Sequence, residues 1–164
     1  NSAASVRFPQ VHYDMIRLGI GMYGIGVNQE TQKHLRYVHK LQSRLSEIRT
    51  IEKGEGVSYM RRFVAEKQSK IGVIPIGYAD GLNRHLSEKG FRVWINGKLA
   101  PIIGSICMDM CMIDLSDIEA KVGDKVVIFG EENPVENMAK ALDTISYEVF
   151  TSVSQRIKRV YFHE

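Results

Sequence analysis

An aspartate in the middle of an apolar run is the first residue whose setting suggests chemistry. The run Pro101–Leu115 is almost wholly apolar and should be buried, yet Asp109 stands inside it between Met108 and Met110. Burying a carboxylate without a partner is costly. Two interpretations remain open: a turn residue bonded to nearby backbone amides, or a carboxylate at the rim of a site with apolar walls. The run by itself favours the turn.

A second candidate combines a cation with glycines. The run Met15–Gly24 contains Arg17 and a Gly-x-Gly-x-x-Gly pattern at Gly19, Gly21 and Gly24. Glycines let backbone amides approach a phosphate closely, but the pattern is unspecific because no clear helix follows the short buried strand that we predict here. Arg17 is either an ion-pair or strand-edge residue, or a fixed donor toward an anion or a ring nitrogen.

Composition limits the alternatives. The 164 residues are 44% hydrophobic and 25% charged with a net charge of +3, which suits one globular domain with a small appendage. No apolar run reaches the roughly 20 residues that span a bilayer. The basic stretch Arg156–Arg159 alternates with apolar residues, which favours a strand over a nucleic-acid patch. We therefore expect neither a membrane nor a nucleic-acid partner.

The two cysteines and the first residues give two further expectations. Cys107 and Cys111 lack the spacing of a zinc site, and two thiols make no disulfide framework, so we expect no metal and buried, reduced cysteines in a cytoplasmic protein. The chain begins at Asn1 without a methionine or a leader, which suggests a segment of a longer polypeptide.

Most of the chain is predicted to form short strands separated by glycine and asparagine turns. The main exceptions are a helix at Ser2–Arg7 with Ser2 as a possible cap, helical spacing of leucine and isoleucine over Leu41–Ile51, and a helix over Val135–Leu142. The predicted strands are Lys70–Ile76 (an edge or bulged strand, because of Pro75), Phe91–Ile95 and Lys98–Ile106 (a hairpin through Asn96-Gly97), Val122–Phe129 and Val153–Phe162. In the run Pro101–Leu115, two buried strands are predicted, with Asp109 near the bend between them. This pattern favours an all-β barrel or sandwich, to which the first ~25 residues do not belong.

Six motifs occur in one order from residue 1 to about residue 149. They are Asn1-Ser2-Ala3-Ala4, Met15–Gly24, Gly56-Val57-Ser58-Tyr59, Ile74–Gly81, Gly104–Met112 and Thr144–Val149. Together they resemble the C-terminal part of a bacterial alanine racemase, a fold-type III enzyme that uses pyridoxal 5′-phosphate.

The resemblance implies a domain organisation. In that family a (β/α)8 barrel that holds the cofactor precedes a β-domain. Residues 1–35 resemble the end of the barrel, with its last strand and part of a helix, and residues 36–164 resemble the β-domain. The resemblance also implies a strand, not a helix, at Leu41–Ile51.

The resemblance further assigns cofactor-binding roles. Arg17 resembles the arginine that faces the pyridine nitrogen, where a permanent cation keeps that nitrogen unprotonated and tunes the cofactor. Ser2 and the backbone amides of Gly19 and Ile20 resemble part of the phosphate cup. Tyr147 resembles a tyrosine that donates a hydrogen bond to the same phosphate.

Four other residues match the substrate side of the family's site. Tyr59 resembles the catalytic acid/base on one face of the α-carbon, Tyr78 a tyrosine of the substrate entryway, and Met108 and Asp109 residues that line the substrate end. In the family, Tyr59, Met108 and Asp109 act on the other subunit of a head-to-tail homodimer. Outside this motif, a half-buried strand residue would be the preferred interpretation of Tyr59.

Racemisation explains why such residues are needed. A proton leaves one face of the α-carbon and another returns to the opposite face, so two bases are required. In the family these are the lysine that holds the cofactor and the tyrosine that Tyr59 resembles. A phenol is a poor base at neutral pH, so its surroundings must favour the phenolate.

The resemblance leaves three functions to be compared. The first is part of a racemase that makes D-alanine for bacterial peptidoglycan; the second is a racemase for another small amino acid such as serine; the third is a non-catalytic β-module for dimerisation. The family's cofactor-holding lysine lies in the barrel, in a region with no counterpart here. We therefore expect residues 1–164 alone to be inactive.

Overall fold

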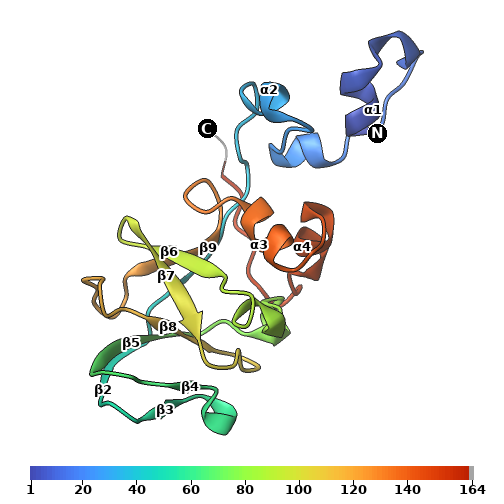
Figure 1. The fold of residues 1–164 in the computed structure, drawn as a ribbon. Coiled ribbons are helices and arrows are strands. Elements are labelled where there is room, and N and C mark those ends of the chain that lie inside the picture. The colour runs from blue at the N-terminus through green and yellow to red at the C-terminus, as the bar shows by residue number, and fades with distance from the viewer. Residues whose placement is uncertain (163–164) are drawn as a thin grey trace. The chain divides into compact units, whose positions relative to one another are not determined.

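The computed structural model describes residues 1–162, so residues 163–164 of the expected β-domain lie outside the described part (Figure 1). The chain forms two compact units, which divide between Lys40 and Leu41. The first holds only short helices, and the second holds every strand that the structure describes. The expectation of a mainly β domain is therefore confirmed for the described residues of the second unit.

The first unit contains the predicted N-terminal helix but not the predicted strand. Its elements are α1 (Ser2–Arg7), a 3-10 helix at Pro9–Val11, a 3-10 helix at Ile20–Tyr23 and α2 (Gln29–Gln32). The side chain of Asn1, not of Ser2, caps α1 by accepting a hydrogen bond from the Ala4 amide at 2.9 Å. The strand predicted over Met15–Gly24 is wrong, because these residues form no strand. A strand needs a hydrogen-bonded neighbour, and this unit, all of it described, contains no strand at all.

The second unit is built on one antiparallel sheet. Seven strands are hydrogen-bonded in the order β1-β9-β6-β7-β8-β5-β2. Their bounds are β1 (Leu41–Arg44), β2 (Glu47–Ile51), β5 (Ser69–Ile74), β6 (Arg92–Ile95), β7 (Lys98–Ile103), β8 (Cys111–Asp114) and β9 (Lys125–Phe129).

The two outer strands of this sheet are consecutive in the chain. Only Leu45 and Ser46 separate β1 from β2, and their amides donate to Asp124 O at the β9 side and to Val73 O at the β5 side. The sheet therefore curls until its two ends meet through one bent segment. The helical spacing over Leu41–Ile51 has a physical origin in this bend, because a bulge after Leu41 and the turn at Leu45 interrupt the two-residue alternation. The helix that periodicity alone predicts here is wrong, and the strand structure implied by the resemblance is confirmed.

The curl encloses the main core. Its fully buried side chains come from strands all around the sheet and include Leu45, Ile74, Val93, Ile95, Ile113, Val126 and Ile128. Gly72 of β5 lies inside the curl, where a Cβ would come within 2.7 Å of side-chain carbons of Leu45 and Leu115. This position therefore has no room for a side chain. Strand β5 is a central strand rather than the predicted edge strand, since Pro75 follows its last residue and blocks no ladder bond.

The predicted hairpin and bend are both present. Asn96 and Gly97 adopt positive φ angles of 47° and 83° between β6 and β7, as a two-residue turn of type I′ requires. The run Pro101–Leu115 contains the second half of β7 and all of β8, and Asp109 lies in the loop between them. This loop, residues 104–110, is the first wall of the candidate site.

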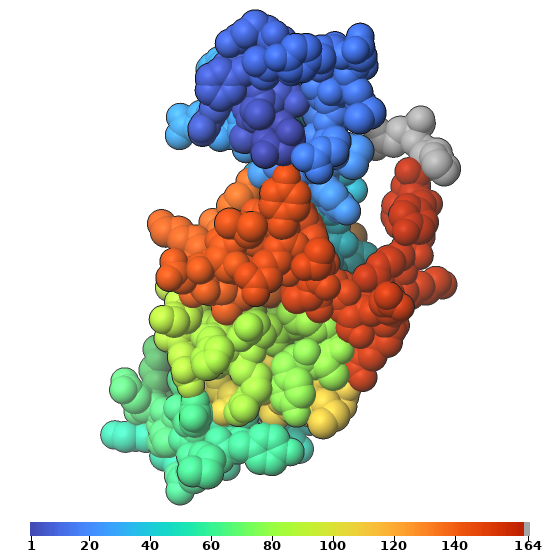
Figure 2. Space-filling view, turned by 90° about the vertical axis from the view of Figure 1, so that its right-hand side faces the viewer, coloured from blue at the N-terminus to red at the C-terminus, as the bar shows by residue number. Residues whose placement is uncertain are grey.

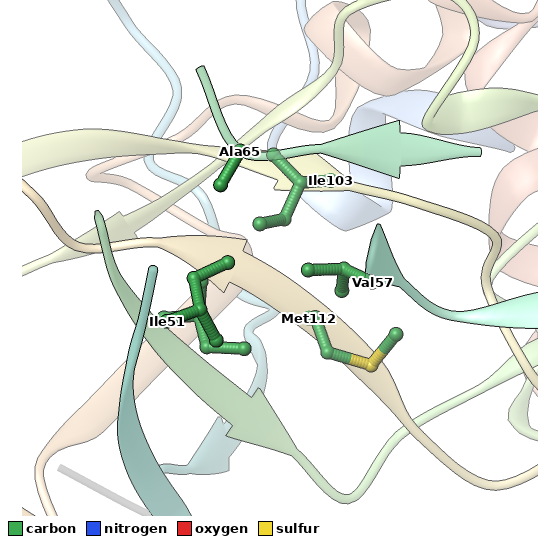
Figure 3. Packing of buried hydrophobic residues seen from close by; sticks show 6 residues of the cluster. Ile51, Val57, Ala65, Ile103 and Met112 are labelled. Atoms are coloured by element: carbon green, nitrogen blue, oxygen red, sulfur yellow. The ribbon is translucent and has the colours of Figure 1, made fainter. Parts of the chain in front are cut away.

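A second hydrophobic cluster anchors a small hairpin to the outside of the sheet (Figure 3). Strands β3 (Gly56–Val57) and β4 (Phe63–Val64) form this hairpin. Val57 and Ala65 pack with Ile103 and Met112 of the sheet. Because strand side chains alternate between faces, β7 and β8 supply residues to both the main core and this cluster. The cluster fixes the loop 58–62, which carries Tyr59.

Two helices and an irregular segment complete the second unit. Helix α3 (Val135–Ala141) confirms the predicted helix, with Val135 and Met138 buried. Helix α4 (Ser146–Ser152) carries Tyr147. The strand predicted over Val153–Phe162 is wrong: these residues follow α4 without regular structure, and the Arg159 guanidinium donates to the carbonyls of Val153, Ser154 and Ile157, which bends the segment around that side chain. In Figure 2 the start of this segment, in red, touches the green surface, where the Ser154 amide donates to the Asp80 carbonyl, and the rest of the segment runs away from that surface.

Within residues 1–162, no helix combines the length and the apolar character needed to cross a membrane, and no three His, Cys, Asp or Glu side chains are grouped for a metal ion.

The second cluster gives a test of how the hairpin is held. Replacing Ile103 by Ala should lower the free energy of unfolding by about 2–5 kcal/mol, because it removes buried methyl groups and leaves a cavity. Leu99 lies on the same strand but is exposed, so Leu99→Ala should change stability by less than about 0.5 kcal/mol. Urea unfolding of both variants provides the measurement, and equal losses would contradict this account of the cluster.

Candidate functional site

Tyr59, Met108 and Asp109 lie around one hollow of the second unit. Its volume is about 520 Å³, and it opens between the hairpin loop 58–62 and the loop 104–110. Its lining residues are Ser58, Tyr59, Cys107, Met108, Asp109, Met110 and Met112. Among these residues Asp109 alone carries a charge, so the hollow has apolar walls with one carboxylate and one phenol.

The loop that carries Tyr59 has an unusual backbone. Ser58, Met60 and Arg61 all have positive φ angles (67°, 61° and 50°), which residues with side chains rarely adopt. Ser58 also has ψ of 179°, a combination found almost only in glycine. Such strain persists only where the surroundings impose it. Here it directs the Tyr59 side chain outward, with 74% of its surface exposed.

Contacts between the two loops hold Ser58 in this conformation. The Ser58 hydroxyl donates a hydrogen bond to the Ser105 carbonyl at 2.9 Å. Gly104 allows this approach, because a Cβ there would lie 2.8 Å from the Ser58 Cβ and 3.0 Å from the Val57 carbonyl oxygen. The φ angle of Gly104 is +67°, which independently favours glycine.

Tyr78 lies on a third loop, which is bonded to the same 104–110 loop. The amides of Tyr78 and Ala79 donate to the carbonyls of Cys107 and Met108, both at 3.0 Å. Gly77 permits this contact, since a Cβ there would come within 2.3 Å of both carbonyl oxygens. Tyr78 does not line the hollow that contains Tyr59; its ring faces the Arg84 guanidinium, 5.9 Å from the ring centroid.

Arg156 is a site residue that sequence reasoning missed. Its Nε donates to Asp80 Oδ1 at 2.7 Å, and its Nη2 donates to Asp109 Oδ1 at 2.5 Å. Burial of Asp80 raises the pKa of its carboxyl, but the bonds from Arg156 and the Gly77 amide outweigh burial and hold that pKa below its ordinary value. The two aspartates raise the pKa of Arg156 in turn. Asp109 is therefore neither a simple turn residue nor an unpaired carboxylate.

The cysteines follow the expectation in part. Cys111 is fully buried, and burial together with the neighbouring Cys107 raises the pKa of its thiol to about 12. Cys107 is only partly buried, and its sulfur lies 3.9 Å from the Ser58 hydroxyl. Both are free thiols.

In the first unit the structure brings Ser2 and the glycine loop together. The buried Ser2 hydroxyl accepts hydrogen bonds from the amides of Gly19 at 2.9 Å and Gly21 at 3.4 Å. Ile20 follows directly at the start of its 3-10 helix, and Arg17 is exposed. Tyr147, the remaining predicted cofactor residue, lies on α4 of the second unit and does not line the Tyr59 hollow.

Substitution at Gly104 tests the contact between the loops. Gly104→Ala should destabilise the protein by about 1–3 kcal/mol more than Gly90→Ala. Gly90 has the same φ, +68°, but open space around its Cβ position, so its substitution adds backbone strain without a collision. Chemical unfolding measures both, and indistinguishable values would show that the approach of Ser58 is not tight.

The Asp80 carboxylate predicts a defined pH dependence. Because its folded pKa lies below the ordinary value of 3.8, the ionised group stabilises the fold above that value and loses this effect as pH falls through the folded pKa. Asp80→Asn should therefore be less stable than the wild type near pH 6, and the difference should shrink below about pH 4. Thermal unfolding across this range is the measurement; a difference that grows at low pH would have the wrong sign.

Comparisons with known proteins agree on one family. Residues 38–161 match the family model described as "Alanine racemase, C-terminal domain". An alanine racemase of Halalkalibacterium halodurans is 44% identical over all of this chain and 44% of its own length. One of Geobacillus stearothermophilus is 41% identical over 99% of this chain and 43% of its own length. The chain thus spans less than half of the length of these relatives.

Solved structures show the same similarity. The alanine racemase of Clostridium difficile 630 in complex with cycloserine superposes with a TM-score of 0.92 and 40% identity over 98% of this chain and 44% of its own. The biosynthetic alanine racemase of Pseudomonas aeruginosa superposes with a TM-score of 0.88 and 36% identity, over 99% of this chain and 46% of its own. On these grounds the chain belongs to the alanine racemase family and carries that family's C-terminal domain.

Proposed function

We propose that this chain is the C-terminal part of a pyridoxal phosphate-dependent racemase that interconverts L- and D-alanine for peptidoglycan synthesis. The observation that carries the proposal is the placement of Tyr59: an outward phenol on a strained, anchored loop, beside the one carboxylate of a small, mostly apolar hollow. A hollow of this character suits a substrate as small as alanine.

Tyr59 is the proposed acid/base for one face of the α-carbon. A general base must reach the proton that it removes, and a mobile side chain loses that geometry. The Ser58–Ser105 bond and the hydrophobic cluster under the hairpin both hold the Tyr59 loop. Its ring nevertheless faces outward from its own unit, which supports a role on an active site formed with a second subunit of a homodimer.

Met108 and Asp109 are the proposed substrate contacts, and Tyr78 the proposed entryway residue. Backbone bonds join the Tyr78 loop to Cys107 and Met108, so the two loops are held side by side. The Asp109 carboxylate accepts from Arg156 through Oδ1, which leaves Oδ2 to accept a hydrogen bond from a polar substrate group.

Residues 1–35 are proposed to be the end of a (β/α)8 barrel, and residues 36–164 the β-domain. In the first part, Ser2 and the glycine loop fit the phosphate end of pyridoxal phosphate. The Ser2 hydroxyl already accepts from two loop amides, so its own hydrogen remains to be donated to a phosphate oxygen. Close approach is possible because the loop contains Gly19 and Gly21.

The other proposed cofactor contacts are Ile20, Arg17 and Tyr147. The Ile20 amide lies between the Gly19 and Gly21 amides that bond to Ser2. Arg17 would supply a permanent cation toward the ring nitrogen, and Tyr147 would donate its phenol hydrogen to the phosphate. Bound pyridoxal phosphate supplies an electron sink that makes the α-hydrogen of an amino acid acidic.

The key test is Tyr59→Phe in a full-length protein that contains these residues. Racemisation should fall by about 10²- to 10⁴-fold, equally in both directions because the two enantiomers have the same free energy. Exchange of the α-hydrogen for deuterium in D₂O should persist for one enantiomer only, since the second base remains.

A matched control is Tyr161→Phe, which removes the hydroxyl of another exposed tyrosine in the same unit. It should leave racemisation and exchange unchanged. Full activity of the Tyr59→Phe protein would remove Tyr59 from the mechanism, and turnover of serine but not alanine by the wild type would identify a different racemase.

We also propose that residues 1–164 alone do not racemise alanine, because the lysine that holds the cofactor belongs to the barrel in this family. The purified 164-residue chain, mixed with pyridoxal phosphate and L-alanine, should give no D-alanine above a blank without protein. D-alanine formation would refute the requirement for the barrel.

A further inference from the structure

Arg156 connects two loops of the candidate site through one guanidinium group. Its Nε bonds to Asp80, which follows Tyr78 by two residues, and its Nη2 bonds to Asp109, which follows Met108. The backbone adds a second connection, because the Ser154 amide donates to the Asp80 carbonyl at 3.1 Å. Thus the C-terminal segment ties the Tyr78 loop to the carboxylate of the hollow.

The two halves of this bridge differ in burial. The Asp80 side chain is only 8% exposed, so its ion pair with Arg156 lies where an unpaired charge is costly. The Asp109 side chain is 57% exposed and that of Arg156 47%, and pairs with such exposure contribute little to folding stability. The bond to Asp109 therefore calls for a role other than stability.

Charge and geometry at the hollow indicate that role. An amino acid substrate carries a carboxylate, which an unneutralised Asp109 would repel. The Arg156 cation cancels this charge, and its bond fixes Oδ1, so that Oδ2, which has no hydrogen bond to any residue among 1–162, is oriented for a donor. A guanidinium holds two carboxylates in fixed directions, whereas the lysine ammonium is a single point charge.

We infer that Arg156 is a positioning residue that orients the Asp109 carboxylate at the hollow and neutralises it, thereby favouring binding of a substrate that bears its own carboxylate. The inference rests on the proposed function and deepens it. It assigns a role in substrate affinity to a residue outside the hollow itself.

Steady-state kinetics of the full-length protein test the inference. Arg156→Gln should raise KM for alanine about three- to tenfold, the effect of one uncompensated charge a few ångströms away in a partly aqueous setting, with a smaller change in kcat. Added salt should reduce this KM defect because it screens the exposed charge. Arg156→Lys should recover part of it, since it restores charge without the two-way bond.

The matched background is Asp109→Asn, which removes the charge that Arg156 is inferred to neutralise. In that background, Arg156→Gln should raise KM much less than in the wild type. An unchanged KM in the single variant, or an equal rise in both backgrounds, would overturn the inference.

Hydrogen exchange of the same proteins separates this inference from the proposed function. Amides of Tyr78 and Ala79 should exchange faster in Arg156→Gln than in the wild type, while the β6–β7 hairpin amides stay protected, which shows that the fold is intact. If the wild type does not racemise alanine, the proposed function fails and the role in substrate affinity with it. Unchanged exchange at Tyr78 and Ala79 would independently refute the positioning role.

Discussion

Close approach of backbones around the loop 104–110 is the constraint on which the candidate site depends. On one side, Gly104 lets Ser58 come near enough to bond the Ser105 carbonyl. On the other, Gly77 lets the Tyr78 loop donate to the carbonyls of Cys107 and Met108. A side chain at either glycine would push a neighbouring loop away. Three loops distant in sequence thus become one rigid rim.

The sheet makes this rim possible. Strands β7 and β8 face the main core with one set of side chains and the hairpin cluster with the other. The same two strands therefore stabilise the curled sheet, anchor the Tyr59 hairpin and support the loop that carries Asp109. The strain at Ser58, Met60 and Arg61 is tolerated because the packing beneath the loop leaves few alternatives.

Local patterns in the sequence predict much of the sheet but little of what joins its loops. Asn96-Gly97 specifies its turn because both residues tolerate positive φ, and the run around Asp109 shows two buried strands. Periodicity wrongly predicts a helix over Leu41–Ile51 because the bend between β1 and β2 produces a helix-like spacing of apolar residues. It wrongly predicts a strand over Met15–Gly24 because an apolar run forms a strand only where a partner strand lies beside it. Arg156 escapes detection because its partners lie 76 and 47 residues away. Such pairing depends on the tertiary fold, and no local signal announces it.

The most direct measurement of the central claim, that Tyr59 completes the active site of a partner subunit, uses mixed dimers of the full-length protein. One chain would carry Tyr59→Phe and the other a substitution of the lysine that is proposed to hold the cofactor, so that each homodimer is expected to be inactive. If Tyr59 acts across the dimer, mixing the chains restores racemisation, because one of the two sites regains both bases. If mixed dimers form and remain as inactive as the parents, the account is contradicted.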